Sequence, residues 1–307
     1  NNASGPLATI EAPQPFIFGL SNTNMVVLST LSPIQLKLAG FPLAWLQPWT
    51  DGLTLAGTFA PAELQLAARI DRYGVRPLTP LKLEGISVRR GDRELLPTAS
   101  LSLQPGLDLT FICVTAPTFQ IAFTGTAHAT DVQLDFDGRR ALDLDLALGF
   151  KGNDKLTIPD LLNLSARSDF SAIPNAPTLG LPPRGILVAR INGELLGAEP
   201  VELWTRLTGV PDAENPQQSL PPVELTLLGK ISREQVFTGG VELLVAGAPQ
   251  PSDLKFDVSM NLIEGGLKIT SGLHSQFLDG AALLAYARAF PSSTTPAAPA
   301  APAPRPD

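Results

Sequence analysis

Cysteine, histidine and charged residues are all scarce in this chain. Cys113 is the only cysteine, which excludes an intrachain disulfide and a metal site built on several thiolates. His128 and His274 are the only histidines, so zinc chemistry based on imidazoles is limited too. Charged residues make up 17% of the chain, below the roughly 25% of an average globular protein. We therefore expect neither a metal site nor a cofactor.

Clustered basic residues and long apolar runs are also missing. The 22 Lys and Arg are scattered and outnumbered by 29 Asp and Glu, so nucleic acid is not expected as a partner and a polybasic patch for a membrane surface is absent. No apolar run approaches the ~18–20 residues that span a bilayer. The candidate at 41–49 is broken by Pro42 and Pro48. We expect no transmembrane span within the chain.

The first residue is Asn1 rather than methionine. We interpret this as a processed or excised chain, which is compatible with a cleaved signal or a missing N-terminal anchor.

Alternating apolar and polar residues dominate what is present. Such alternation is typical of strands with one buried and one wet face, and the 26 Gly and 30 Pro supply turns. We predict an all-β chain of antiparallel hairpins, forming a curved sheet or a sandwich with an apolar inner face. One C-terminal helix is expected to pack on it.

Turn signals recur between the predicted strands. Asp-Gly, Asn-Gly and Gly-Gly pairs between alternating runs favour tight hairpins, and a turn is also expected within "RRGDRE" at 89–94. Two short strands are expected around Pro105-Gly106. The predicted tight turns lie at Asp137-Gly138, Asn192-Gly193, Gly239-Gly240 and Gly265-Gly266.

Two segments interrupt the strands. Residues 157–170 are predicted to start a helix with Pro159 in its first turn, and a Pro-rich stretch at 173–185 marks a provisional boundary. We thus expect an N-terminal β-rich region over 1–172, a C-terminal one over 185–290 and a disordered Pro/Ala tail over 291–307. An irregular insertion is expected at 209–224.

A helix is predicted over 280–290. Asp279 is expected to cap its start and Pro291 to end it. The residues expected to pack it on the sheet are Leu283, Leu284, Tyr286 and Phe290.

The stretch "VQLDFDGRRALDLDLALGF" at 132–150 carries four acids that suggest a cation or catalytic site: Asp135, Asp137, Asp143 and Asp145. Alternation places Asp135, Asp143 and Asp145 on the face opposite the leucines, so strand geometry alone explains their proximity. A flat strand face rarely wraps a Ca²⁺ ion, and Arg139 and Arg140 are near enough to offset the charge. We interpret the acids as a solvated face.

Catalytic constellations are weak. On one regular strand His128 and Asp131 would point to opposite faces, and the GxSxG elbow is missing. His274 is interpreted as a loop or capping residue, and "RGD" at 90–92 as a hairpin turn. We predict a protein that is not an enzyme.

The apolar face of the 132–150 hairpin is the candidate site, as a surface for a hydrophobic ligand. The same alternation fits two arrangements: a filled core of a sandwich or barrel, or an open groove that holds acyl chains. The residues of this face are Val132, Leu134, Phe136, Leu142, Leu144, Leu146 and Leu148.

The chain resembles the AsmA-like family of bacterial envelope proteins. The resemblance is carried by "GLTLAGTFAPAELQLAARI", "GTAHATDVQLDFDGRRALDLDLALGF" and "VELTLLGKI…GGVELLVAG", within 53–273. It implies long amphipathic strands behind an N-terminal anchor, in a curved sheet whose hydrophobic groove carries lipid between membranes. No invariant motif is matched, so no residue role follows from it.

Two functions are therefore expected. The first is a non-enzymatic protein of the bacterial cell envelope, periplasmic or surface-exposed, whose amphipathic sheet binds or conducts lipid or another hydrophobic ligand. The alternative is a structural or assembly subunit of a surface or secretion complex with a filled core, whose edge strands pair with other envelope proteins.

Overall fold

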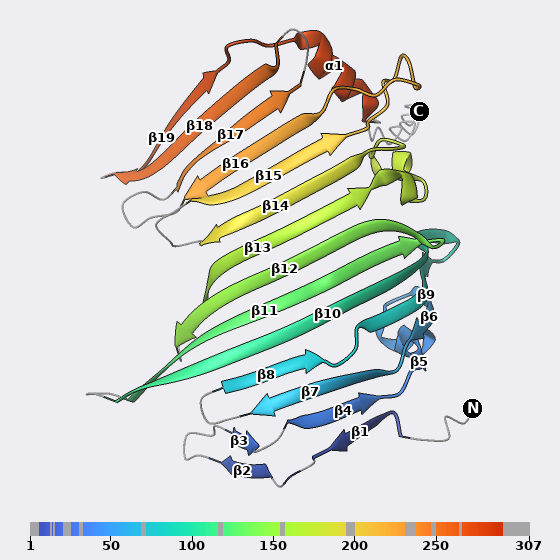
Figure 1. Cartoon of the computed structure of the whole chain (residues 1–307), viewed down its shortest axis with the longest axis vertical. Coiled ribbons are helices and arrows are strands. Elements are labelled where there is room, and N and C mark those ends of the chain that lie inside the picture. The colour runs from blue at the N-terminus through green and yellow to red at the C-terminus, as the bar shows by residue number, and fades with distance from the viewer. Residues whose placement is uncertain are drawn as a thin grey trace, which may run out of the picture.

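The computed structural model describes most of the 307-residue chain. The described residues are 6–12, 14, 16–20, 26–30, 33–68, 72–115, 119–153, 157–194, 200–230, 237–246, 250–263 and 266–290. Strands dominate it, in one 17-stranded sheet and a separate two-stranded one, and the single α-helix follows the last strand. The predicted all-β class is confirmed (Figure 1).

The N-terminal third forms two branches that meet at one long strand, β10 (Arg93–Thr115). One branch runs β1–β4–β7–β8 and the other β5–β6–β9. The 3₁₀ helix η1 (Leu43–Trp49) connects β5 to β6, and β2 pairs with β3 in the separate two-stranded sheet. The strands are β1 (Ala8–Glu11), β2 (Phe16–Leu20), β3 (Val26–Thr30), β4 (Ile34–Leu38), β5 (Phe41–Pro42), β6 (Leu53–Phe59), β7 (Ala62–Ala68), β8 (Arg72–Pro77) and β9 (Leu81–Arg90).

From β10 onward, each strand pairs antiparallel with the next one along the chain. Two 3₁₀ turns, η2 (Phe170–Ala172) and η3 (Ala176–Leu179), lie between β13 and β14. The elements are β11 (Phe119–Phe136), β12 (Arg139–Asn153), β13 (Thr157–Asp169), β14 (Ile186–Glu194), β15 (Val201–Thr208), β16 (Val223–Lys230), β17 (Phe237–Val245), β18 (Ser252–Ile263), β19 (Gly266–His274) and α1 (Gly280–Ala289).

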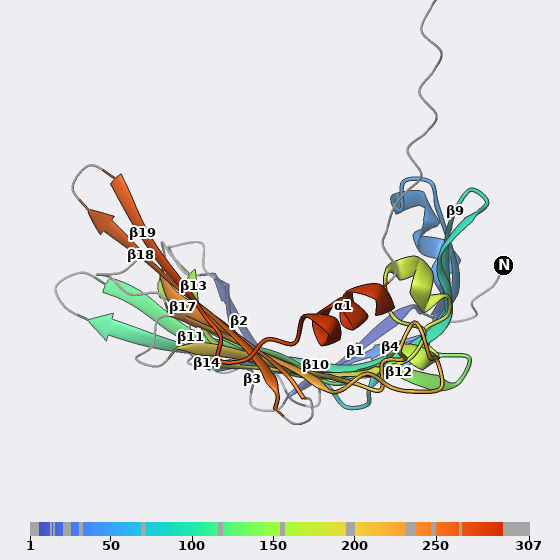
Figure 2. The ribbon, with the colours of Figure 1, turned by 90° about the horizontal axis from the view of Figure 1, so that it is seen from above.

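The sheet is bent into a trough. Seen from above, it rises on both sides, and α1 lies within the hollow (Figure 2). The long axis of the trough runs across the strands. We call the side that holds α1 the concave face and the opposite side the convex face.

The predicted hairpin at 132–150 is confirmed. β11 ends at Phe136 and β12 begins at Arg139, with Asp137 (φ 48°) and Gly138 (φ 74°) between them. Positive φ at both central residues is the requirement of a type I′ turn, which Asp-Gly fulfils. The predicted turn between β9 and β10 is also present, at Gly91 and Asp92. β18 and β19 form a hairpin in which Ile263 faces Gly266, and the turn predicted at Gly265-Gly266 lies partly outside the described residues.

The predicted helix at 157–170 is wrong, because this segment is strand β13 up to Asp169. It is paired with β12 on one side and β14 on the other. Pro159 lies at a register shift opposite Phe150, where a missing backbone N–H is tolerated. Pairing with two neighbours outweighs a local helix signal.

Three other turn or break predictions are also wrong. Asn192-Gly193 lies inside β14, Gly239-Gly240 lies inside β17, and β10 runs unbroken through Pro105-Gly106. The flanking residues pair with different strands instead of folding back on each other: Asn192 faces Asn163, and Gly240 faces Asp257.

Helix α1 and the irregular segment at 209–222 are found where they are expected. The Asp279 carboxylate accepts hydrogen bonds from the N–H groups of Ala281 and Ala282. Tyr286 is buried and Leu283 partly buried against the sheet, together with Phe290. Leu284, which was predicted to pack there, is exposed instead. The spacing of three residues between Leu283 and Tyr286 defines the inward stripe, and position 284 falls outside it.

The small hydrophobic core lies along one side of the trough. Val210, Leu220 and Val245 form one cluster under α1. Phe136 and Ala172 belong to the other, beneath η2. Between β13 and β14 the sheet continues without a break across the Pro-rich segment that was predicted as a boundary. The predicted tail over 291–307 lies outside the described residues.

Candidate functional site

Apolar side chains form continuous rows across the concave face. Residues directly opposite one another on antiparallel strands share a face, so the register identifies each row. One row crosses every strand from β10 to β19 and is apolar throughout. Its members are Pro105, Ala129, Leu146, Leu164, Ile191, Leu203, Leu227, Val241, Phe256 and Leu273.

Neighbouring rows widen this stripe and extend it into the N-terminal branch. The row nearer to α1 contains Val132, Leu144, Ala166, Ala189, Thr205, Leu225, Leu243 and Leu254. On the other side, another row contains Ile34, Leu66, Val75, Leu107, Ala127, Leu148 and Leu162. Helix α1 identifies the face of the sheet on which these rows lie. It lies in the hollow and packs against Leu243, a member of the row nearer to α1, so the rows belong to the concave face.

The middle of this face is open. Among the described residues, α1 and the 170–185 segment cover only the side of the trough where the two core clusters lie. Side chains in the middle rows, such as Leu146 and Leu203, are half-buried. Exposure is high at both edges of the sheet, where Leu273 on β19 is 66% exposed and Ile10 on β1 is 71% exposed. Within the described ranges, the concave face is thus an apolar trough without a second layer over its middle.

The seven predicted site residues are divided between this open face and the closed core. Phe136 is buried in the cluster with Ala99 and Ala172, and Leu134 packs partly against that cluster. Leu142, which faces Leu134, lies beside it. The remaining four, Val132, Leu144, Leu146 and Leu148, are half-buried members of the open rows.

The seven predicted site residues all lie on β11 and β12, so the part of the site on β14–β19 was not predicted. Alternation in "VELTLLGK" and "DLKFDVSM" carries the same signal as the hairpin, and could have indicated Leu227 and Phe256. The sequence alone does not show the strand register that places these residues in one row with Leu146.

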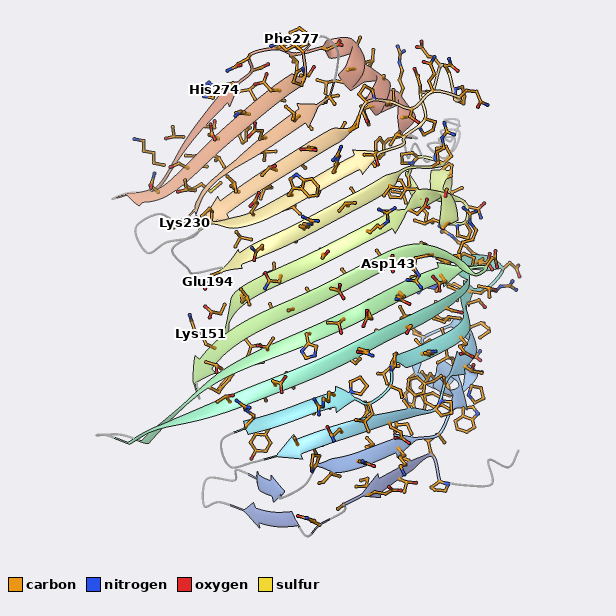
Figure 3. The ribbon with its side chains drawn as sticks, in the orientation of Figure 1. Asp143, Lys151, Glu194, Lys230, His274 and Phe277 are labelled. Atoms are coloured by element: carbon orange, nitrogen blue, oxygen red, sulfur yellow. The ribbon has the colours of Figure 1, made fainter. Side chains whose placement is uncertain are left out.

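The convex face is polar and held by pairs across strands. Arg206 pairs with Glu224, and Lys255 with Glu242 at 2.9 Å. The Glu242 carboxylate holds the pKa of Lys255 above its usual value. One row of this face contains Asp145, Ser165, Arg190, Trp204, Thr226, Glu242, Lys255 and His274. Lys151, Glu194 and Lys230 lie at or near the ends of β12, β14 and β16 away from α1 (Figure 3).

Asp135, Asp143 and Asp145 lie on this face, and each has an ion-pair or hydrogen-bond partner there. The Arg140 guanidinium pairs with Asp135 and Asp143 and donates to Gln133 Oε1 at 2.8 Å. The Asp135 hydrogen bond is the main cause that raises the pKa of Arg140. Asp145 accepts from the backbone N–H of Asp131 at 2.8 Å. Within the described part of the chain, no group of three or more acids, histidines or cysteines could hold a metal ion.

His128 lies on the convex face, where its imidazole covers Gly106 so closely that a Cβ there would be 2.2 Å from Nε2. A shallow hollow beside it is lined by Arg72, Arg76 and Asp108. Asp131 follows a register shift between Ala129 and Val132 and has a φ of 51°. The regular alternation of side chains between the two faces, which was assumed for His128 and Asp131, is therefore interrupted between them. No hydrogen bond joins these two described residues.

Comparison with family models, with curated proteins and with solved structures found no significant match to this chain. None of the helices in the described ranges has the length and apolar character needed to cross a membrane.

Proposed function

We propose that the trough binds hydrophobic ligands, acyl-chain lipids in particular, along its concave face, and that it acts without catalysis. The observation that supports this most strongly is the row from Pro105 to Leu273, which crosses ten strands without one polar side chain. The resemblance to AsmA-like proteins agrees with it and favours a place in the bacterial cell envelope.

The energetic argument follows from the exposed apolar area. Removing apolar surface from water contributes about 25 cal/mol per Å². An acyl chain that covers about 200 Å² of its own and the protein's surface would therefore gain roughly 5 kcal/mol before the cost of immobilisation. The convex face, with its ion pairs and its Arg190–Trp204 contact, offers no comparable surface.

The direction of the rows suggests conduction as well as storage. Neighbouring strands lie about 4.8 Å apart, so the apolar row from β10 to β19 extends about 43 Å. Along this length an acyl chain would pass from one apolar side chain to the next without crossing a charged side chain in the row. A lipid could move along the trough with its headgroup in water and its chains on the concave face.

Adjacent leucines on β16 allow a matched test. Leu227 belongs to the concave row and Leu228 to the convex face, where it lies opposite Glu202. Their exposures are similar, 37% and 41%. A charge at position 227 would meet the ligand, whereas a charge at 228 would meet water, so Leu227→Asp and Leu228→Asp separate ligand contact from general destabilisation.

We expect the gently purified chain to carry acyl-chain lipids, quantified by mass spectrometry after organic extraction. Leu227→Asp should reduce bound lipid by about tenfold, because a desolvated charge costs more than 1.4 kcal/mol. Leu228→Asp should leave it unchanged. Absence of lipid from the wild-type chain, or equal loss in both variants, would contradict the proposal.

An assembly subunit is the second candidate, and the edge of β19 favours it. Among the described residues β19 pairs only with β18, so one side of its backbone is available to a strand from another chain. The mass of the particle in dilute solution separates the two functions. A stable oligomer without bound lipid would favour assembly, and a monomer with lipid would favour the trough.

A further inference from the structure

The most exposed aromatic side chains of the described residues lie on one short element at the rim of the trough. Helix η1 presents Trp45 at 47% and Trp49 at 79% exposure, with Leu46 also exposed between them. The chain has three tryptophans, so two of them are placed in water on the same seven-residue helix. Contiguous exposed apolar side chains of this kind mark an interaction surface. We call Trp45, Leu46 and Trp49 the rim patch.

The rim patch is mounted rigidly on the sheet. Leu43 is buried at the start of η1. The ring of Phe41 stacks on Trp45, with 6.2 Å between centroids, and on Phe59, with 5.2 Å. At the other end, the backbone N–H and hydroxyl of Thr50 both donate to the carbonyl of Gln47. The backbone of η1 and the ring of Trp45 are therefore held in place before any partner arrives, which lowers the entropic cost of binding.

An apolar row joins the rim patch to the trough. Phe41 faces Phe59 across β5 and β6, and Phe59 faces Leu83 on β9. Leu83 faces Leu101, which in turn faces Leu134; Leu134 packs partly against the core cluster of Ala172 and lies on the concave face beside the open rows. A surface that covers the rim patch would thus be connected to the proposed lipid site by side chains that are all apolar.

The charges beside the rim patch are balanced. β6 begins at Leu53, opposite Arg90, and Thr54 lies opposite Arg89, so the β9–β10 turn lies next to the end of η1. Arg89 pairs with Glu94 at 3.6 Å. The local basic residues are Arg89, Arg90 and Arg93, and the local acids are Asp51, Asp92 and Glu94. A surface with no net charge suits zwitterionic headgroups and does not require anionic lipid.

We propose that the rim patch docks the protein on the surface of a lipid bilayer, with the indole rings at headgroup level. Tryptophan prefers this depth because its ring is apolar while its N–H stays in a polar environment. Docking at this rim would place the membrane at one end of the Phe41–Leu134 row, where acyl chains could enter or leave the trough. The route for lipid rests on the proposed function, whereas the membrane contact does not.

Vesicles of phosphatidylcholine test the contact directly. The full chain carrying Trp204→Phe reports only Trp45 and Trp49 by fluorescence. On addition of vesicles we expect a blue shift of their emission, and co-flotation of the protein that persists at high salt. Trp49→Ser in the same chain should lower the partition coefficient by about tenfold, since one large apolar side chain no longer leaves water.

Leu228→Ser is the matched control, because it removes an exposed apolar side chain far from η1 and should bind vesicles as the parent chain does. A parent chain that does not float with vesicles, or a Trp49→Ser chain that floats equally well, would overturn the proposal. In that case a protein partner would be the remaining occupant of the patch. Bound lipid is measured in parallel: vesicle binding without any lipid in the purified chain would refute the proposed function and leave the membrane contact standing.

Discussion

At the scale of single residues, Tyr286 connects α1 to the segment before β16. Its ring is buried in the cluster with Val210 and Val245, and its hydroxyl donates to the carbonyl of Pro221. Burial raises the pKa of this hydroxyl to about 12. The neutral form is therefore favoured in the folded state, and Tyr286 holds α1 in the trough as an uncharged donor.

Tyr286→Phe keeps the ring and removes the hydrogen bond, so we expect the free energy of unfolding at neutral pH to fall by about 1 kcal/mol. Because the folded pKa lies above the ordinary tyrosine pKa of 10.0, the contribution of Tyr286 is complete below about pH 10 and is lost as the pH rises through about 12. Urea unfolding at neutral pH and at about pH 11 checks both points. The wild-type chain should lose more stability than Tyr286→Phe over this interval, and an equal loss would contradict the assigned role.

At the scale of elements, Asp253 fixes the connection between β19 and α1. Its carboxylate accepts from the backbone N–H groups of Gln276 and Phe277, both at 2.9 Å. The bond from Phe277 is the main cause that lowers the pKa of Asp253 below its usual value. This stabilisation is present above the ordinary carboxyl pKa of 3.8 and is lost as the pH falls through the lower folded value.

We expect the amide proton shifts of Gln276 and Phe277 to titrate in an NMR experiment with a midpoint below 3.8. Asp253→Ala should abolish this titration and speed the exchange of both amides with solvent. Asp257→Ala is the control, because Asp257 lies on the same strand but does not accept from these amides. A midpoint at or above 3.8 would show that the two bonds do not form in solution.

Elements could be predicted from the sequence where the signal and the partner are adjacent in the chain. Asp137-Gly138 is a hairpin because the runs on both sides pair with each other. Asn192-Gly193 carries an equally strong turn signal, yet both residues pair with β13, whose position the local sequence does not encode. The helix prediction for the segment around Pro159 is wrong for the same reason, because pairing with two neighbouring strands outweighs the local helix signal.

At the scale of the whole molecule, the alternation of apolar and polar residues does not determine whether a second layer covers the apolar face of the sheet. The four leucines of β12 would alternate identically in a sandwich core and in a trough. The outcome depends on whether another layer covers them, and in the described part of the chain α1 is too short to reach beyond the side where Tyr286 and Val245 are buried. The site was thus predictable as a face of one hairpin, but its length and openness were not.

If the proposed function is correct, lipid contacts the concave face of the sheet and not the convex face. A photo-crosslinking side chain placed at Leu203 tests this most directly, with Glu202 as its neighbour on the opposite face of β15. After irradiation of the gently purified chain, mass spectrometry should detect lipid adducts at position 203 and none at position 202. Equal adducts at both positions, or adducts at 202 alone, would contradict the account.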